Sequence, residues 1–203
     1  MSLAHRLVPL VLTLFAAAGA VRAAEPEHVH ATEAPAALPG GSLYQLGVTL
    51  DAADGARLAL DSLRGAPVVV TMFYSTCTSV CPMLTLQMQH LAAALDDGER
   101  ARVRFLMVSL DATRDTPQQL AAFAAEHHLP QPPFTVAHAA AGDVRAIAAA
   151  LGIRYRQLPD ASFSHSSVIT LLDRDGVPAA RTQVLAAEDP GFIASLRAEL
   201  GAR

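Results

Sequence analysis

Residues 67–82 read PVVVTMFYSTCTSVCP, and this stretch decides both the fold class and the chemistry open to the chain. Its first eight residues are apolar or β-branched without polar alternation, which is typical of a strand buried on both faces of a sheet. Pro82 suits the first residue of a helix, and apolar residues at helical spacing continue to Leu95. Cys77 and Cys81 are therefore expected between the end of a buried strand and the start of a helix.

This position favours thiolate chemistry. Free backbone N–H groups and the helix dipole stabilise a thiolate at a helix N-terminus, and a thiolate is both a nucleophile and a metal ligand. Three residues separate Cys77 from Cys81, one more than in thioredoxin-type oxidoreductases, so the wider loop lets both sulfurs converge on a soft ion such as Cu(I). A structural disulfide is a weaker interpretation, because a loop of five residues constrains the unfolded chain very little. The residues alone leave metal binding and redox exchange open.

Strand and helix patterns alternate along the rest of the chain. We expect extended segments at 43–50, 57–60, 67–74, 103–110, 134–137 and 167–173, and a last one ending near 184. We expect helices at 82–95, 118–128, 143–151 and 190–200, with Thr116 and Asp143 as N-caps. The first two extended segments form an N-terminal β-hairpin around the turn at 51–55. This order predicts an α/β, thioredoxin-like fold with a mixed central sheet flanked by helices.

Composition excludes several classes of function. Hydrophobic residues make up 52% and charged residues 17% of the 203 residues, which excludes a polar disordered protein. The net charge of −4 offers no basic face for nucleic acid. All positive side chains are arginine, so a mechanism that needs a lysine Schiff base or a P-loop lysine is excluded.

The N-terminus reads as a targeting segment. An apolar run at 7–21 is short for a membrane span of about 20 residues and fits a cleavable signal better. We expect a signal peptide at 1–23, or an uncleaved anchor, then a flexible tether at 24–40 and a domain at 41–203. No cysteine follows the run to carry a lipoprotein anchor. The tether's His28 and His30 could collect Cu(II) or belong to a solvated linker.

A third metal ligand is needed for a trigonal soft site, and His165 is the best placed of the eight histidines. In a thioredoxin-like fold the segment that enters the strand at 167–173 faces the redox loop. Taken alone, a histidine before a strand is more often a hydrogen-bonded loop residue. Met83 is near enough to the loop to touch a metal, whereas Met88 falls in the apolar stripe of the helix and is expected in the core. Asp115 is expected to cap a helix or to pair with Arg114.

Four short motifs together resemble the Sco/SenC family over about residues 40–200. They are CTSVCP at 77–82, VSLD at 108–111, RDTP at 114–117 and HS at 165–166. The resemblance implies a copper chaperone that binds Cu(I) or Cu(II) through Cys77, Cys81 and His165. It also implies delivery to the binuclear copper centre of cytochrome c oxidase. Thr78-Ser79 and Ala112 depart from the proline-containing positions common in the family, and neither departure removes a ligand.

The N-terminal leader and the resemblance together set the expected surroundings of the protein. We expect an exported monomer in the bacterial periplasm, either free or tethered to the inner membrane. The expected partner is the copper-bearing oxidase subunit, with another periplasmic copper carrier or a thiol reductant as further partners. The competing function is thiol–disulfide exchange, with Cys77 attacking and Cys81 resolving. A cysteine peroxidase ranks last, because no arginine lies in the loop beside Cys77.

Overall fold

The computed structural model describes residues 37–202. Its nine strands are β1 (Thr49–Ala52), β2 (Arg57–Ala59), β3 (Val68–Phe73), β4 (Arg104–Ser109), β5 (Phe134–His138), β6 (Tyr155–Gln157), β7 (Phe163–His165), β8 (Ile169–Leu172) and β9 (Pro178–Thr182). Its helices are η1 (Leu43–Leu46), η2 (Leu60–Leu63), α1 (Val80–Ala93), α2 (Asp97–Arg100), α3 (Pro117–Glu126), α4 (Ala141–Leu151) and α5 (Pro190–Gly201). The predicted signal peptide, most of the predicted tether and its histidines lie outside the described residues.

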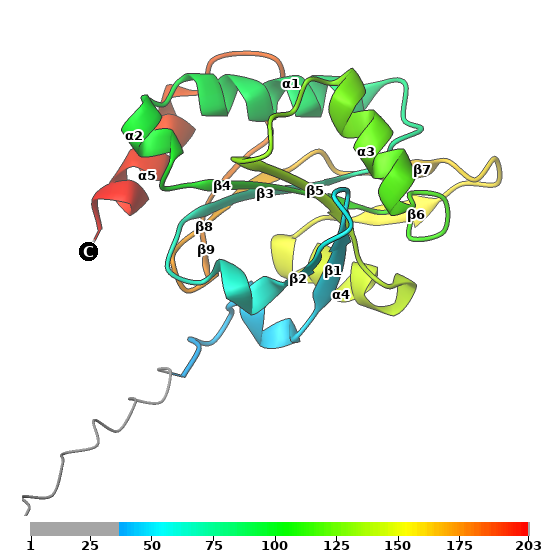
Figure 1. Ribbon diagram of the computed structural model, residues 1–203, viewed down its shortest axis with the longest axis horizontal. Coiled ribbons are helices and arrows are strands. Elements are labelled where there is room, and N and C mark those ends of the chain that lie inside the picture. The colour runs from blue at the N-terminus through cyan, green and yellow to red at the C-terminus, as the bar shows by residue number, and fades with distance from the viewer. Residues whose placement is uncertain (1–36, 203) are drawn as a thin grey trace, which may run out of the picture. The chain divides into compact units, whose positions relative to one another are not determined.

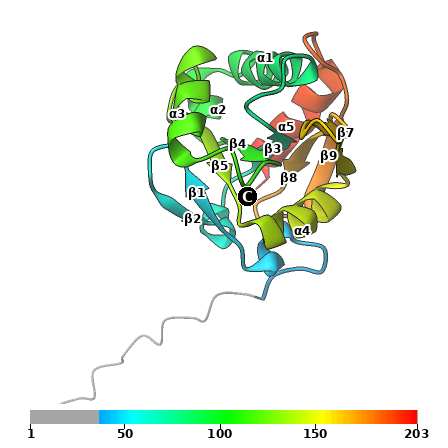
Figure 2. The same ribbon diagram turned by 90° about the vertical axis from the view of Figure 1, so that its right-hand side faces the viewer.

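A seven-stranded mixed sheet in the order β2-β1-β5-β4-β3-β8-β9 forms the centre of the fold. The strands β3, β4 and β5 run parallel, and β8 pairs antiparallel to β3. Helices α1, α3 and α5 cover one face of the sheet, and α4 covers the other with η1 and η2 (Figures 1 and 2). The expected thioredoxin-like α/β fold with a mixed sheet is confirmed.

The apolar run that decided the fold becomes the central strand β3, and all six of its residues are buried. Because side chains alternate across a strand, Val69 and Phe73 enter the core beneath α1, while Val68, Val70 and Met72 enter the core beside α4. A strand between two such layers needs apolar residues at every position, which is why its sequence shows no alternation. Its carboxyl end delivers the chain directly into the cysteine loop.

Local signals were right at several helix ends and wrong at others. Thr116 caps α3 by accepting a hydrogen bond from the backbone N–H of Gln119, as expected. Asp143 was wrong as an N-cap, since α4 already begins at Ala141 and places Asp143 in its first turn. The extended segment predicted at 43–50 was wrong over its first half, which forms the 3₁₀ helix η1; β1 then begins at Thr49.

Two elements near the candidate site were not predicted. A short antiparallel ribbon of β6 and β7 stands apart from the main sheet, with Tyr155 paired to His165 in register. His165 therefore ends a strand, although a loop position was expected. Among the described residues, no helix has the length and apolar character needed to cross a membrane.

Candidate metal and thiol site

The helix after the cysteine loop starts earlier than its sequence indicated. Helix α1 begins at Val80, so Cys81 lies in its first turn and the prediction of a start at Pro82 was wrong. The backbone N–H of Cys81 donates to Cys77 Sγ at 3.4 Å, and Ser79 makes no side-chain capping bond. The sulfur therefore takes the place of a capping oxygen, and proline is tolerated in the first turn because N–H groups there have no helical partner.

Cys77 is prepared as a thiolate. Burial by itself raises the pKa of its thiol, but hydrogen bonds from the Cys81 side chain and from the N–H groups of Ser79 and Cys81 act the other way. The neighbouring Tyr74 side chain acts in the same direction, and the net result lowers the pKa of Cys77 to about 7. With 8% of its surface exposed, Cys77 combines thiolate character with limited access. That combination is what both metal binding and nucleophilic attack require.

Cys81 behaves in the opposite way. It is fully buried, and burial followed by the hydrogen bond that it donates to Cys77 raises the pKa of its thiol. Both cysteines are free thiols in the structure. Above about pH 7 the pair keeps its remaining proton on Cys81, which is the thiol that must lose it when a metal ion arrives.

His165 approaches the pair from the β6–β7 ribbon. Its Nε2 lies 3.6 Å from Cys81 Sγ, although 84 positions separate the two residues in the sequence. Burial lowers the pKa of His165, which favours the neutral ring. Its Nδ1 lies 3.3 Å from the carbonyl of Ser166, and only an N–H can donate there. That hydrogen bond leaves the Nε2 lone pair facing Cys81.

The distance between Cys81 Sγ and His165 Nε2 suits two ligands of one ion. Bonds of about 2.0 Å to nitrogen and about 2.3 Å to sulfur at a trigonal or tetrahedral angle separate the two atoms by about 3.6 Å. Within residues 37–202, however, no three His, Cys, Asp or Glu side chains already form a group that could hold a metal ion. Binding through all three predicted ligands therefore requires a local adjustment that brings Cys77 Sγ into the same shell.

Asp115 braces the cysteine loop, a role that the sequence did not reveal. Its carboxylate is 1% exposed and accepts hydrogen bonds from the hydroxyls of Ser75 and Ser109. It also accepts from the backbone N–H of Ser75 at 3.0 Å. The expected roles as a helix cap or as a partner of Arg114 were wrong: Thr116 caps the helix, and Arg114 pairs with Asp111. The bracing ties the start of the loop to the end of β4.

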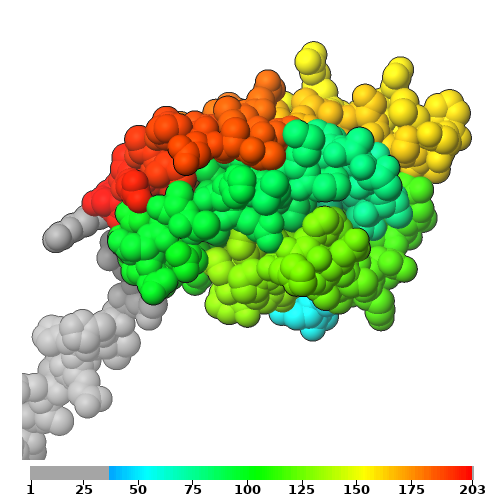
Figure 3. Space-filling model, turned by 90° about the horizontal axis from the view of Figure 1, so that it is seen from above, coloured from blue at the N-terminus to red at the C-terminus, as the bar shows by residue number. Residues whose placement is uncertain are grey.

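Arg114 braces the other half of the site. Its guanidinium pairs with the buried Asp111 and donates to the carbonyl of Ala161, in the turn between β6 and β7. The ribbon that carries His165 is thus anchored to the end of β4. Figure 3 shows the yellow ribbon beside the teal beginning of α1. The RDTP motif was the available signal, but the contact of Arg114 with Ala161, 47 positions away, could not be inferred from it.

Tyr74 joins the two halves through its ring and hydroxyl. The ring packs edge-on against His165, with centroids 6.0 Å apart, and against Phe163. Its hydroxyl donates to the carbonyl of Phe163 at 3.3 Å. Of the two methionines considered, Met88 is in the core as predicted, whereas Met83 has 46% of its surface exposed.

Most of the chain is similar in sequence to one known protein family. A sequence model described as SCO1/SenC matches residues 43–199, which is most of the chain. The chain belongs to the SCO1/SenC family. A curated relative, the SCO1 protein homolog of Bacillus subtilis, is 34% identical to this SCO1/SenC chain over 76 residues. That match covers 37% of this chain and 39% of the relative, well under two thirds of its length.

Solved structures of low identity share the fold with this SCO1/SenC chain. A putative electron transfer protein from Aquifex aeolicus has a TM-score of 0.71 at 20% identity, covering 79% of this chain and 94% of its own. Bradyrhizobium japonicum ScoI, solved with copper bound, has a TM-score of 0.61 at 19% identity and covers 75% and 96% of the two chains. These likenesses establish the fold of this chain.

Proposed function

We propose that this chain is a copper chaperone that binds Cu(I) through Cys77, Cys81 and His165. The proposed recipient is the copper-bearing subunit of cytochrome c oxidase during its assembly. The observation that carries the proposal is the approach of His165 Nε2 to Cys81 Sγ at 3.6 Å, beside a Cys77 thiol whose pKa is about 7. Thiolate and imidazole are the ligand types that copper favours in proteins.

Relatives support the choice of metal and recipient. The Sco proteins of Bradyrhizobium japonicum and Arabidopsis thaliana were solved with copper bound. Another structural relative, BsSco, is described as a member of the Sco family of cytochrome c oxidase assembly proteins. These descriptions concern those proteins, and we extend them to this chain through the shared family.

The electrostatics of the site suit a transferable ion. Two thiolates, a neutral His165 and one Cu(I) carry a net charge of about −1, which a site near solvent tolerates. His165 is half-buried and lines a surface cavity of about 400 Å³, so this proposed ligand is reached from solvent. Transfer then proceeds by exchange of one ligand at a time, without release of a free ion.

Titration of the reduced protein with Cu(I) tests this proposal. We expect one equivalent to bind, with X-ray absorption showing two sulfur neighbours and one nitrogen neighbour. His165→Ala should lose the nitrogen neighbour and weaken binding, whereas His90→Ala, at an exposed position on α1, serves as the matched control. Absence of bound Cu(I), or an unchanged metal environment in His165→Ala, would overturn the assignment.

We also propose that the protein acts outside the cytoplasm, in the bacterial periplasm. The support is the apolar N-terminal run followed by a charged and proline-containing segment. A structural relative from Bacillus anthracis is described as a SCO1/SenC family lipoprotein, which is a statement about that protein. Fractionation of cells, with mass spectrometry of the mature N-terminus, tests export and cleavage together.

The opposite pKa shifts of the two thiols favour thiol–disulfide exchange as a second candidate. The Cys77 thiolate attacks a target disulfide and releases one target thiol. The Cys81 thiol then loses its proton and attacks the mixed disulfide, which releases the second target thiol and leaves a Cys77–Cys81 disulfide. Two electrons pass to the target, and a dithiol reductant must restore the pair. Reduction of a disulfide-bonded peptide should stop at the mixed disulfide in Cys81→Ser; no reduction by the native chain would dismiss this function.

A further inference from the structure

Most arginines of the described chain have partners for their guanidinium groups, and those that lack one are not scattered evenly. Within residues 37–202, four arginine side chains have no ion pair or hydrogen bond: Arg104, Arg145, Arg154 and Arg156. Three of these four surround the β6–β7 ribbon that carries His165; Arg104 lies at the opposite end of β4. We call Arg145, Arg154 and Arg156 the arginine surface.

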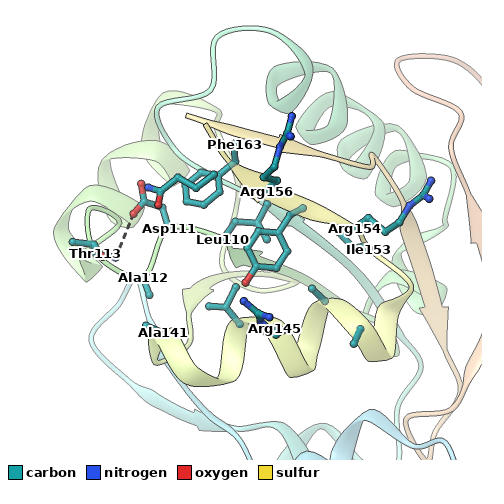
Figure 4. A pocket seen from close by; sticks show the side chains of 15 residues that line it. Leu110, Asp111, Ala112, Thr113, Ala141, Arg145, Ile153, Arg154, Arg156 and Phe163 are labelled. Carbon is teal, nitrogen blue, oxygen red and sulfur yellow. Dashed lines mark hydrogen bonds between the residues drawn. The ribbon is translucent and has the colours of Figure 1, made fainter. Parts of the chain in front are cut away.

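The arginine surface borders a cavity of about 710 Å³ between α4 and the ribbon. Figure 4 shows Arg145 on α4 at one side of the cavity, while Arg154 and Arg156 extend from the other side toward the outer face of the ribbon. Tyr155 and Phe163 also line the cavity. Its one acidic lining residue is Asp111, whose carboxylate is already paired with Arg114. The cavity therefore combines apolar walls with the unpaired Arg145, and Arg154 and Arg156 border it from the ribbon.

The arginine surface is continuous with the candidate metal site. A second cavity of about 400 Å³ is lined by Arg154, Arg156, Ser164 and His165 among others. Arg156 pairs in register with Ser164, and Tyr155 with His165, so the positive residues and the candidate ligand occupy neighbouring positions on one ribbon. A molecule that occupies this second cavity contacts Arg154, Arg156 and His165.

Charge decides what such a molecule must be. The chain carries a net charge of −4, so it repels an acidic protein on average. Such a protein is attracted only to a part of the surface where positive side chains cluster, as they do on the arginine surface. The nearby acidic residue Asp160 is engaged within its own turn, accepting from the N–H and hydroxyl of Ser162. An acidic partner is thus attracted and oriented by this one face.

We propose that the arginine surface is the docking site for an acidic, extended segment of the protein that exchanges copper with this chain. Glutamate or aspartate side chains of the segment pair with Arg145, Arg154 and Arg156, and an apolar side chain fills the cavity beside Tyr155 and Phe163. The segment then holds its own metal ligands next to His165. This inference rests on the proposed copper exchange and adds the chemistry of the partner.

The test uses two synthetic peptides as copper acceptors. Each contains two cysteines and one apolar residue; one carries five glutamates, and the other carries glutamines at the same positions. Cu(I) transfer from the loaded chain is followed by rapid mixing at about 0.02 M and about 0.5 M salt. We expect the glutamate peptide to accept copper on the order of tenfold faster at low salt, with the difference lost at high salt.

Variants locate the effect. The triple variant Arg145→Gln, Arg154→Gln, Arg156→Gln should lose the preference for the glutamate peptide and keep its Cu(I) binding. Arg104→Gln removes one equally unpartnered arginine far from the ribbon and is the matched control for Arg156→Gln. Arg156→Gln should slow Cu(I) transfer to the glutamate peptide, and Arg104→Gln should not. Equal rates for both peptides with the native chain, or a preference that survives in the triple variant, would overturn the proposal.

A separate measurement keeps the docking proposal distinct from the copper proposal. If the native chain binds no Cu(I), the proposed function fails, and docking is read from fluorescence anisotropy of the labelled glutamate peptide with the metal-free chain. Salt-sensitive binding that the triple variant loses supports the docking site. If the glutamate peptide does not bind, the docking proposal is overturned. It is also overturned if the chain binds phosphatidylglycerol vesicles through these arginines but does not bind the peptide, because the surface is then a membrane-binding surface.

Discussion

Replacement of Asp115 by alanine is the perturbation that most directly tests how the site is held together. The change removes the acceptor of three hydrogen bonds, from the N–H and hydroxyl of Ser75 and from the hydroxyl of Ser109. Ser109 is fully buried, so its hydroxyl loses a partner that water cannot replace, whereas Ser75 is only half-buried. The cost is therefore dominated by Ser109 and by the loosened loop.

The magnitude follows from these contacts. An unsatisfied buried hydroxyl costs about 1–3 kcal/mol, and hydrogen bonds to a charged group contribute about 1.5–3 kcal/mol each. The carboxylate's own desolvation offsets part of the total. We expect Asp115→Ala to lower the free energy of unfolding by about 2–4 kcal/mol, and Asp115→Asn, which keeps one acceptor oxygen, by about 1–2 kcal/mol. At about 2–4 °C per kcal/mol for a domain of this size, the alanine variant should melt roughly 5–15 °C lower.

Urea unfolding of the reduced, metal-free protein measures the change. The denaturant slope should stay constant, so that a shift in midpoint reports stability alone. Asp97→Ala is the matched control, since the Asp97 side chain is 99% exposed and pairs with Arg100 only at the surface. Asp97→Ala should be indistinguishable from the native protein. If Asp115→Ala unfolds at the same urea concentration as that control, the bracing role argued for Asp115 is wrong.

Three further predictions rest on separate contacts. Alkylation of Cys77 should accelerate from pH 6 to pH 8 with a midpoint near its pKa of about 7, because the thiolate fraction rises through that value. Cys81→Ala removes a hydrogen-bond donor to Cys77 and should move this midpoint upward. A midpoint above pH 8 in the native protein contradicts the thiol pairing. Arg114→Gln should speed hydrogen exchange in the β6–β7 turn several-fold, read by mass spectrometry, because that turn loses its tie to Asp111; unchanged exchange there refutes the tie. Gly176→Ala should lower stability by about 2–4 kcal/mol in thermal unfolding, because its φ is +82° and a Cβ would lie 2.6 Å from the ring of Tyr44. Gly47 has a φ of +62°, and a Cβ added there would have no atom within 4 Å, so Gly47→Ala measures the cost of the backbone strain alone. An equal loss of stability in both variants would rule out the contact with the ring of Tyr44.

The sequence predicted those features of the structure that depend on residues close to one another in the chain. The unbroken apolar run of β3 marks a strand buried on both faces, and the signal at Thr116 correctly identifies a helix start. The position of Cys77 between that strand and α1 was predictable for the same reason. The start of α1 was misplaced, because the group that caps it is the Cys77 sulfur, and this is not one of the usual capping side chains.

The sequence by itself thus determined the fold class, the buried strands and the thiol pair, because each follows from side-chain patterns within a few residues. The tertiary structure alone decided that His165 meets Cys81, that Asp115 holds the cysteine loop and that unpartnered arginines gather beside the site. The first two of these contacts join segments 84 and 40 positions apart. Such segments become neighbours only once the strands have paired in one order and register, and no local preference of the residues encodes that order.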